Sequence, residues 1–544
     1  MRKVELSGYP FIRPSLMHHC QQAEPSRSRE YEMSGAKLFE VVSRLPNRRP
    51  GRRLFILLRD TWDDWFKYET TFQLFMDDET GHRSQIGSVK IGRIGMTPKD
   101  RKPPIPDTFD ALDSAFFSVG QSDDYYETIA GLSSGFGRIV FEALRDCAYD
   151  PTTFQKARHE DVMRTSLLRG VSSQRVNGRF HNLAHGRVEP TSFGFCYRFF
   201  ANSPEPKLRF EVVPKSLPPT NIHVLIGRNG VGKTRLLDRC TRALLGIPPS
   251  DGREAASLDF DDGEKNGTFA NVISVSFSAF DPFGPILPND IPTGGITYAY
   301  LGLKKQRSDP GQPYESKGRS ELQREFVQAV QTCRTAARLS RWQQALETLE
   351  SDPLFEEADV SRLIDMPDDR LEETAAKLFE KLSSGHGIVL LSITRLVELV
   401  DERSLVLLDE PEGHLHPPLL SAFVRALSQL LTLRNGVAVI ATHSPVVLQE
   451  VPAVCVWTIT RSREEVRVDR PEIETFGENV GLLTREVFGL EVQRSGFHTL
   501  LAREIAASNG NYEAVIEAFA GQLGAEARAI LRGMALTYNP NDRL

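Results

Sequence analysis

The sequence predicts an α/β fold, and three observations support this prediction. Apolar runs of strand length recur at "NIHVLI", "NVISVSF", "SLVLLD" and "NGVAVIAT". The last two runs are separated by "LLSAFVRALSQLLTL", which has the spacing of an amphipathic helix. Strands that are apolar on both faces and alternate with helices are typical of a parallel sheet covered on both sides. A β-rich N-terminal lobe, a helical insertion and a C-terminal helical region complete the predicted architecture.

Along the chain, residues 1–35 are polar and irregular, so we expect a flexible extension there. The stretch "YETTFQLFMDDETGHRSQIGSVKIG" alternates apolar and polar residues around the turn "DDETGH", which predicts a β-hairpin with one buried face. "TSFGFCYRFF" and "LRFEVVP" predict further strands. We assign residues 36–470 to one main domain that includes the hairpin and has helical insertions at about 105–170 and 318–382. Residues 471–544 are expected to form a C-terminal helical region.

Composition excludes several classes of protein. The chain has 544 residues and a net charge of −6, so no global basic field points to nucleic acid. Its six cysteines are scattered without a CxxC pair, which argues against a disulfide scaffold and a cysteine zinc site. No apolar run reaches about 18 residues, and the N-terminus lacks the apolar core of a signal peptide. We therefore expect a cytoplasmic protein with no membrane segment.

The stretch "GRNGVGKT" fits the pattern G-x-x-x-x-G-K-[ST] between a buried strand and a helix. Glycines let the backbone wrap closely around a phosphate, and the helix N-terminus attracts the anion. Lys233 is expected to reach the β- and γ-phosphates, and Thr234 to offer its hydroxyl to Mg²⁺. The predicted nucleotide-binding residues of this loop are Gly227, Arg228, Asn229, Gly230, Val231, Gly232, Lys233, Thr234 and Arg235.

Three further stretches supply chemistry that suits a nucleotide. Asp409 and Glu410 end the buried strand "SLVLLDE", where Asp409 is expected to hold Mg²⁺ and Glu410 to polarise the attacking water. His443 follows the strand "VAVIAT" and is expected to contact the γ-phosphate and orient the water. An anion site is also predicted at the start of a long apolar helix, from Ser383, Ser384 and Gly385. One chain hardly needs two phosphate-binding helix starts, whereas two copies arranged head to tail would use both.

The stretch "LVLLDEPEGHLHPPLL" at residues 405–420 also invites a metal interpretation. It packs Asp409, Glu410, Glu412, His414 and His416 into eight positions. We assign the first two to the nucleotide. The two histidines are expected to pack or hydrogen-bond across a dimer interface, because no third partner is spaced to complete a tetrahedral zinc site.

Together, the four stretches resemble the ABC-type ATPases, the clan that includes SMC-like repair proteins. "GRNGVGKT" is similar to Walker A, "LVLLDE" to Walker B, "LSSGH" to the LSGGQ-type signature with His386 in place of glutamine, and "ATHS" to the switch-histidine loop. The resemblance covers about residues 190–460. It implies a P-loop ATPase with a mixed sheet that sandwiches ATP and Mg²⁺ between two subunits. No glutamine follows "NVISVSFSAFDPF", so Ser278 or Asp281 is expected to replace the glutamine loop.

Within this clan, "LSSGH", "DEPEGHLHPPL" and "ATHSPVVLQEV" most resemble the ATPase subunit of Septu-type anti-phage systems, which is related to OLD-family ATPase domains. "EGHLHP" occupies the loop that crosses the dimer interface in ABC ATPases. The resemblance implies a homodimer or higher even oligomer with slow, switch-like ATP hydrolysis. It also implies a separate HNH-type nuclease partner and a role in anti-phage defence.

Three other functions stay open at this stage. An OLD-like nuclease would need a Toprim domain, but only about 80 residues with helical patterns follow "CVWTIT". A transporter ATPase subunit would be smaller than this chain. An SMC-like DNA-repair ATPase would need DNA contacts, for which "NRRPGRR", with Arg48, Arg49, Arg52 and Arg53, and residues 169–187 are the basic candidates, although either could be a solvated loop.

Overall fold

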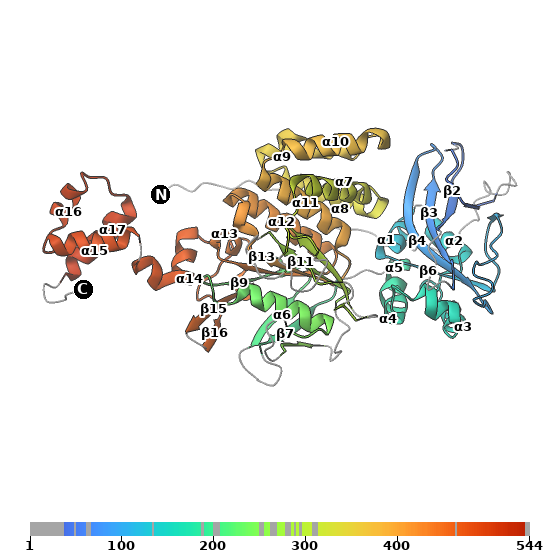
Figure 1. The fold of residues 1–544 in the computed structure, drawn as a ribbon, viewed down its shortest axis with the longest axis horizontal. Helices are drawn as coiled ribbons and strands as arrows, with labels where there is room; N and C mark the ends of the chain where they lie inside the picture. The colour runs from blue at the N-terminus through green and yellow to red at the C-terminus, as the bar shows by residue number, and fades with distance from the viewer. Residues whose placement is uncertain are drawn as a thin grey trace, which may run out of the picture.

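The computed structural model describes residues 37–538 except for 48–49, 61–66, 133–134, 187–189, 200–206, 250–254, 262–268, 278–283, 288–289, 293–295, 307–313, 463–464 and 495. The expected N-terminal extension lies outside these residues. None of the described helices is both long and apolar enough to cross a membrane. Figure 1 shows an N-terminal lobe at one end, a central α/β body, and C-terminal helices at the other end.

The central body is built on a seven-stranded sheet with the order β12-β11-β13-β14-β9-β15-β16. Six strands run parallel, and β16 pairs antiparallel with β15, so the predicted mixed sheet is confirmed. In chain order, the strands are β9 (Ile222–Ile226), β11 (Asn271–Ser276), β12 (Thr297–Gly302), β13 (Ser404–Asp409), β14 (Val437–Thr442), β15 (Val456–Ser462) and β16 (Glu465–Asp469).

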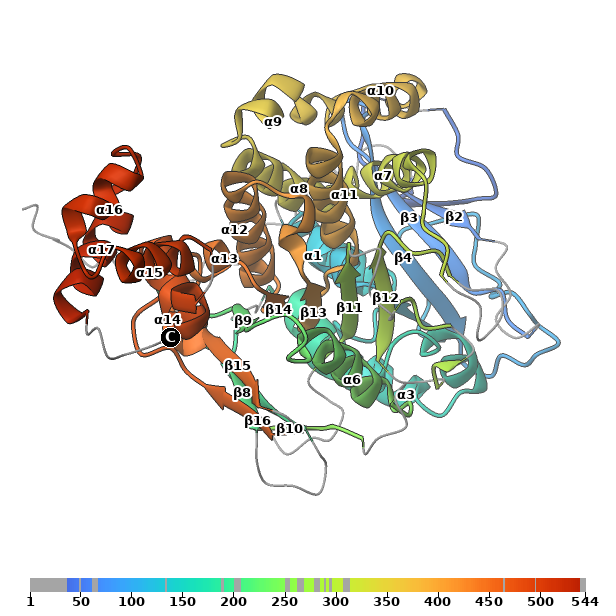
Figure 2. The same cartoon turned by 60° about the vertical axis from the view of Figure 1, so that its left-hand side comes forward.

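The apolar runs of the sequence are strands buried on both faces. In β13, Leu405 and Leu407 face one hydrophobic cluster, and Val406 and Leu408 face another. Successive side chains of a strand point to opposite faces, so a strand between two cores needs an apolar residue at every position. Helix α6 (Lys233–Leu245) lies on one face of the sheet, and the larger helical layer lies on the other (Figure 2).

The two layers have different compositions. Helix α6 shares its core with a three-stranded antiparallel sheet of order β10-β7-β8. The expected strands in "TSFGFCYRFF" and "LRFEVVP" are two of these strands, which are β7 (Phe193–Arg198), β8 (Lys207–Val212) and β10 (Ser257–Phe260). The opposite layer and its connections comprise α7 (Arg319–Cys333), α8 (Ala336–Leu349), α9 (Pro353–Ala358), η6 (Val360–Leu363), α10 (Asp368–Lys381), α11 (Ser384–Leu399), η7 (Pro411–His414), α12 (Pro417–Leu433), α13 (Pro445–Leu448) and η8 (Ala453–Cys455).

The N-terminal lobe has a separate sheet and a separate hydrophobic core. The expected hairpin is β3–β4, and it lies in a six-stranded sheet of order β5-β1-β2-β3-β4-β6. Its strands are β1 (Phe39–Val42), β2 (Leu54–Arg59), β3 (Thr71–Asp77), β4 (Arg83–Arg93), β5 (Thr108–Phe109) and β6 (Phe116–Gly120). Its helices are α1 (Asp123–Ala130), α2 (Phe136–Ala143), α3 (Pro151–Ala157), η3 (Met163–Leu167), α4 (Ser173–Arg175), η4 (Val176–Phe180) and α5 (His181–Ala184).

The segment at 105–170 differs from the helical insertion expected there. It begins with β5 and β6, and its helices pack on the same N-terminal core as the hairpin. The run "FFSVG" of β6 is buried at every position and pairs with β4. A short apolar run without alternation does not distinguish a buried strand from a helix, which is why the sequence pattern was misleading here.

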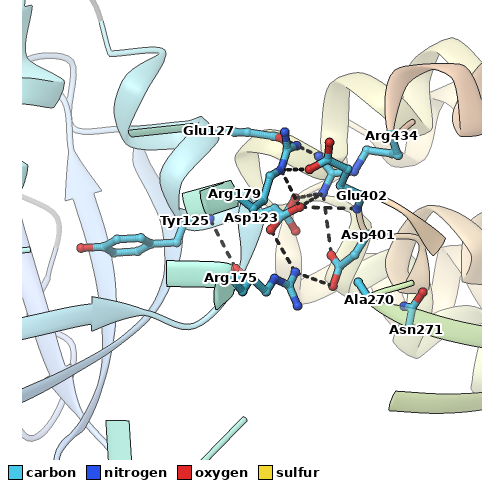
Figure 3. Close-up of polar contacts among 12 residues, drawn as sticks. Asp123, Tyr125, Glu127, Arg175, Arg179, Ala270, Asn271, Asp401, Glu402 and Arg434 are labelled. Carbon is cyan, nitrogen blue, oxygen red and sulfur yellow. Dashed lines mark hydrogen bonds and ion pairs between the residues drawn. The ribbon is translucent and has the colours of Figure 1, made fainter. Parts of the chain in front are cut away.

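A network of buried charges joins the N-terminal lobe to the central body (Figure 3). Asp123, at the start of α1, pairs with Arg175 at 2.9 Å, and Arg175 also pairs with Asp401 at 3.2 Å. Arg434, at the end of α12, pairs with Glu127 and lies 3.5 Å from Asp123. Burial raises the pKa of Asp123, but Arg175, Arg434 and Arg179 together outweigh it and lower that pKa to about 2.

This network also uses arginines of the basic stretch at 169–187 that was considered for DNA contact. Arg175 and Arg179 belong to that stretch, and Arg179 pairs with Glu402. Both side chains are mostly buried against carboxylates. In the other basic stretch, Arg53 lies over the ring of Phe136 at 4.4 Å, and Arg48 and Arg49 lie outside the described residues. Arg53, Arg175 and Arg179 therefore contribute to the fold, whereas Arg52 and Arg169 are exposed.

The C-terminal region is helical, as expected, and extends away from the central body (Figure 1). It contains α14 (Val480–Arg494), α15 (Phe497–Ala507), α16 (Tyr512–Ala518) and α17 (Ala525–Thr537). The last three helices share a small core around Leu501, Ile505, Val515 and Leu531.

Candidate functional site

The glycine-rich loop lies between β9 and α6, at the carboxyl end of β9, which pairs with β14 and β15 inside the sheet. Gly230 and Gly232 have φ of +81° and +104°, a left-handed backbone that side chains rarely adopt. A Cβ atom on Gly227 would lie 2.3 Å from the carbonyl oxygen of Ile459. A Cβ on Gly230 or Gly232 would meet nothing within 4 Å, so open space lies beside this part of the loop. The loop thus has the curvature and the open side that a phosphate needs.

Lys233 begins α6 and is folded back over the loop. Its Nζ atom donates to the carbonyl oxygens of Gly227 at 2.9 Å and Arg228 at 3.1 Å. The side chain is only 4% exposed. Burial lowers the pKa of Lys233 below its ordinary value, and the nearby carboxylates oppose that shift in part. The ammonium group is therefore held at the loop, where a bound phosphate could replace the carbonyl contacts.

Thr234 and Asp409 meet although they lie 175 positions apart. The Thr234 hydroxyl donates to Asp409 Oδ1 at 3.0 Å. Asp409 is 6% exposed, and a cleft lined by Ser276 and Tyr298, among others, opens beside the pair. A hydroxyl and a carboxylate next to a phosphate loop are the oxygen donors that suit Mg²⁺ bound to a nucleotide. The residues present thus fit ATP and Mg²⁺.

Glu410 and His443 lie side by side at the same sheet edge. Glu410 has a φ of +45°, which is uncommon outside glycine and occurs often at functional sites. Its Oε1 atom lies 3.7 Å from Nδ1 of His443, and both side chains are partly exposed, at 35% and 45%. The geometry leaves a carboxylate and an imidazole available to a water molecule near the phosphate loop.

Glu412 belongs to the site although its role was not predicted from the sequence. Its Oε1 atom accepts from the backbone N–H of His443 at 2.8 Å and from the hydroxyl of Thr442 at 2.6 Å. The same oxygen lies 3.1 Å from Nδ1 of His443. Glu412 thus holds both the backbone and the ring of His443. The only sequence signal is its presence in the acidic stretch, since no spacing rule connects it to a histidine 31 positions later.

The signature serines lie elsewhere in the chain. Ser383 caps α11, and its hydroxyl contacts His386, with Nδ1 at 2.7 Å. Ser383 and Ser384 are exposed, whereas Gly385 is buried. Among the described residues, no hydrogen bond joins Ser383 or Ser384 to the phosphate loop, so a single chain does not bring the two anion sites into contact.

Two expectations cannot be compared with the described residues. Ser278 and Asp281, which were expected to replace the glutamine loop, lie outside them. The side chain of His414 does as well. His416 caps α12, and its Nε2 atom lies 3.5 Å from Asp352.

Part of the chain matches the model of a known protein family. Residues 319–449, which include the signature, Asp409, Glu410 and His443, match AAA_21, an AAA domain whose description associates it with the AbiEii toxin of type IV TA systems. This part of the chain is thus similar to an AAA domain.

Two solved structures show only weak overall likeness. One is CbiO1 from Clostridium perfringens, part of the ABC transporter complex CbiONQ, at 17% identity, with 44% of this chain and 72% of that chain covered and a TM-score of 0.24. The other is an ATP-binding cassette of an ABC transporter in its ADP conformation, at 12% identity, with 56% and 100% covered and a TM-score of 0.29.

A much closer relative is a phage protein. Protein ea59 of Escherichia phage lambda is 41% identical over 504 residues, which cover 88% of this chain and 94% of the relative. This degree of identity over almost the full length of both chains makes the present chain a member of the family of the lambda Ea59 protein.

Proposed function

We propose that the protein binds and slowly hydrolyses ATP, and that two copies close around the nucleotide as a switch. The observation that supports this proposal best is the convergence of Thr234, Asp409, Glu410 and His443 beside the phosphate loop. Lys233 would bind the β- and γ-phosphates there. Thr234 and Asp409 would hold Mg²⁺, which would neutralise phosphate charge. Glu410 would take the proton of the attacking water, and His443 would contact the γ-phosphate.

Dimer formation is part of the proposal because, among the described residues, no hydrogen bond joins the signature serines to the phosphate loop of their own chain. Ser383, Ser384 and Gly385 begin α11, and the two serines are exposed. A helix start with free N–H groups and hydroxyls binds anions. We infer that these residues contact ATP bound to Lys233 of a second copy, in a homodimer or higher even oligomer.

The finer proposal is that this switch regulates or carries a separate HNH-type nuclease, as the likeness of its motifs to the Septu-type ATPase subunit suggests. The residues after β16 support a separate effector, because their described part folds into α14–α17, without the strands that a Toprim nuclease requires. The lambda relative is itself a phage protein. We therefore propose the anti-phage role for this chain and not for that relative.

The test is the substitution Glu410→Gln. It removes the proposed base but keeps the size of the side chain, so ATP hydrolysis should fall by about 100-fold or more while ATP binding persists. Light scattering after size-exclusion chromatography should then show a dimer that is stable with ATP and Mg²⁺ but not with ADP.

The matched control is Glu373→Gln on α10, an exposed glutamate paired with Lys377. This variant should hydrolyse ATP and associate as the wild type does. Hydrolysis by the Glu410→Gln variant at the wild-type rate would contradict the assigned base. A monomer at saturating ATP would contradict the switch.

A further inference from the structure

Three helix starts bring a second set of metal-type ligands together outside the nucleotide site. Asp352 caps α9, His386 lies in the first turn of α11, and His416 caps α12. Their ligand atoms all lie within 4.8 Å of one another. Nε2 of His386 is 3.2 Å from Asp352 Oδ1, and Nε2 of His416 is 3.5 Å from Asp352 Oδ2.

We propose that Asp352, His386 and His416 bind one zinc-type divalent transition-metal ion. In a tetrahedral zinc site with bonds of about 2.0–2.1 Å, ligand atoms are roughly 3.3–3.5 Å apart. The two distances to Asp352 are close to this range, although they run to different oxygens of the carboxylate. A zinc site was not expected from the sequence, because no third partner is spaced near His416. The structure supplies two partners from distant parts of the chain.

The charges at this site favour a cation. Asp352 and His386 are 6% and 4% exposed. Within the described part of the chain, the ion pairs of Asp352 are those with the two histidines. Oδ1 of Asp352 also accepts from the backbone N–H of Leu354 at 2.9 Å, at the start of α9. A buried carboxylate with these partners, none of them a lysine or arginine, attracts a divalent cation. The cluster therefore offers a metal ion a buried carboxylate and two imidazole nitrogens that already lie close together.

The surroundings of His386 suit a metal ligand. Its Nδ1 atom lies 2.7 Å from the hydroxyl of Ser383, and the ring of Phe355 packs edge-on against it at 5.1 Å. Metal-bound histidines typically donate the N–H of the other ring nitrogen to such a partner, which fixes the ring and directs the lone pair to the metal. With Nδ1–H donated to Ser383, the Nε2 lone pair of His386 faces Asp352.

His416 is the more adaptable ligand. Its side chain is 49% exposed, which leaves room for water as a fourth ligand. Its Nδ1 atom accepts a long hydrogen bond of 3.4 Å from the Leu419 N–H. A metal ion bound at Nε2 would require the proton on Nδ1, so this hydrogen bond would be lost. Two imidazoles and one carboxylate favour zinc-type ions over Mg²⁺, which prefers oxygen ligands only.

A metal ion here would connect α9, the start of the signature helix and the chain segment after Glu410. Ser383 would support the metal through His386 and is also the residue proposed to face the ATP of a second copy. The site itself does not depend on the proposed ATP switch, because its ligands are distinct from Thr234 and Asp409.

The test is Co²⁺ binding by the full chain after a chelator has removed bound metal, in excess Mg²⁺ and without nucleotide. Tetrahedral Co²⁺ with nitrogen and oxygen ligands absorbs visible light, so one equivalent per chain should produce a visible band that Zn²⁺ abolishes. His416→Gln should weaken Co²⁺ binding by at least ~10-fold. Loss of a residue that only supports a metal ligand already costs about 10-fold or more, and loss of a ligand should cost no less. The side chain of His416 is half exposed, so this variant should fold.

The matched control is His443→Gln, which removes the partly exposed histidine of the nucleotide site and should leave the cobalt band unchanged. Asp352→Asn should weaken the band as well, while an asparagine can still cap α9. A band that persists in both His416→Gln and Asp352→Asn would overturn the proposal. A wild-type protein without a visible band, or with the intense near-ultraviolet band of a cobalt thiolate, would overturn it too.

Discussion

At the scale of single residues, Glu412 decides where His443 lies. One carboxylate oxygen contacts the backbone N–H and the ring of His443 and the hydroxyl of Thr442. The other oxygen is buried and has no hydrogen-bond partner among the residues that the structure describes. A nearly buried carboxylate with one unpaired oxygen lowers the stability of the fold. This cost is consistent with a functional role for the negative charge of Glu412 at the site. We regard Glu412 as a positioning residue that acts through His443.

We expect Glu412→Gln to lower the kcat of ATP hydrolysis by about 10-fold while KM for ATP changes little. Glutamine keeps an acceptor for the His443 N–H but loses the charge that holds the imidazole. Steady-state kinetics measures kcat and KM separately. The control is again Glu373→Gln, and a change in KM alone would show that Glu412 supports nucleotide binding instead.

At the scale of elements, β9 carries a buried histidine just before the phosphate loop. His223 is 1% exposed, and its Nε2 atom contacts the carbonyl oxygen of Glu211 at 3.2 Å. Burial, and then the charge of Arg470, lower the pKa of His223 to about 3. The strand therefore requires a neutral imidazole.

This requirement predicts acid sensitivity. The folded-state pKa lies below the ordinary value of 6.5, so the contribution of neutral His223 is complete above pH 6.5 and is lost as the pH falls towards 3. At pH 5 the wild type should have lost about 2 kcal/mol from this group, at 1.36 kcal/mol per pH unit. In the variant His223→Gln, the glutamine side chain would not titrate.

The measurement is the denaturant midpoint of both proteins from pH 8 to pH 4. The wild type should lose stability more steeply than His223→Gln below pH 6.5. If the two curves are parallel, the constant difference in stability reflects packing only, and His223 does not titrate in the unfolding reaction.

At the scale of the whole molecule, the buried charge network connects two sheets with separate cores. Arg434 is 2% exposed, and its contact with Glu127 joins residues 307 positions apart. Arg341 on α8 adds contacts from the central body to Asp124 at 2.6 Å and to Glu127 at 3.2 Å. The N-terminal lobe is thus held on the central body by charges that water hardly reaches.

We expect Arg434→Met to destabilise the protein by roughly 3 kcal/mol or more, because it removes a buried positive charge that Asp123 and Glu127 share with other arginines. The matched control is Arg138→Met, which breaks the exposed pair with Glu142 and should leave the free energy of unfolding nearly unchanged. Denaturant unfolding compares the two, and hydrogen exchange should become faster in α1 and at the end of α12. Equal effects would show that the network is dispensable.

The sequence by itself determined the central strands and the motifs that follow them. A strand buried on both faces is apolar at every position, and a phosphate loop needs glycines, a lysine and a hydroxyl at fixed spacing, so both leave local patterns. The pairing of Thr234 with Asp409 could be expected for a related reason. Parallel strands deliver their carboxyl ends to one edge of the sheet.

Only the tertiary structure decided which distant residues share a site. Asp352 meets His386 across 34 positions and also meets His416, Glu412 meets His443 across 31, and Arg434 meets Glu127 across 307. The separate sheet of the N-terminal lobe is a further example, since its strand β6 has no local alternation to reveal it. These contacts depend on how whole helices and sheets pack, and the residues that make them carry no periodic or spaced signal in the chain.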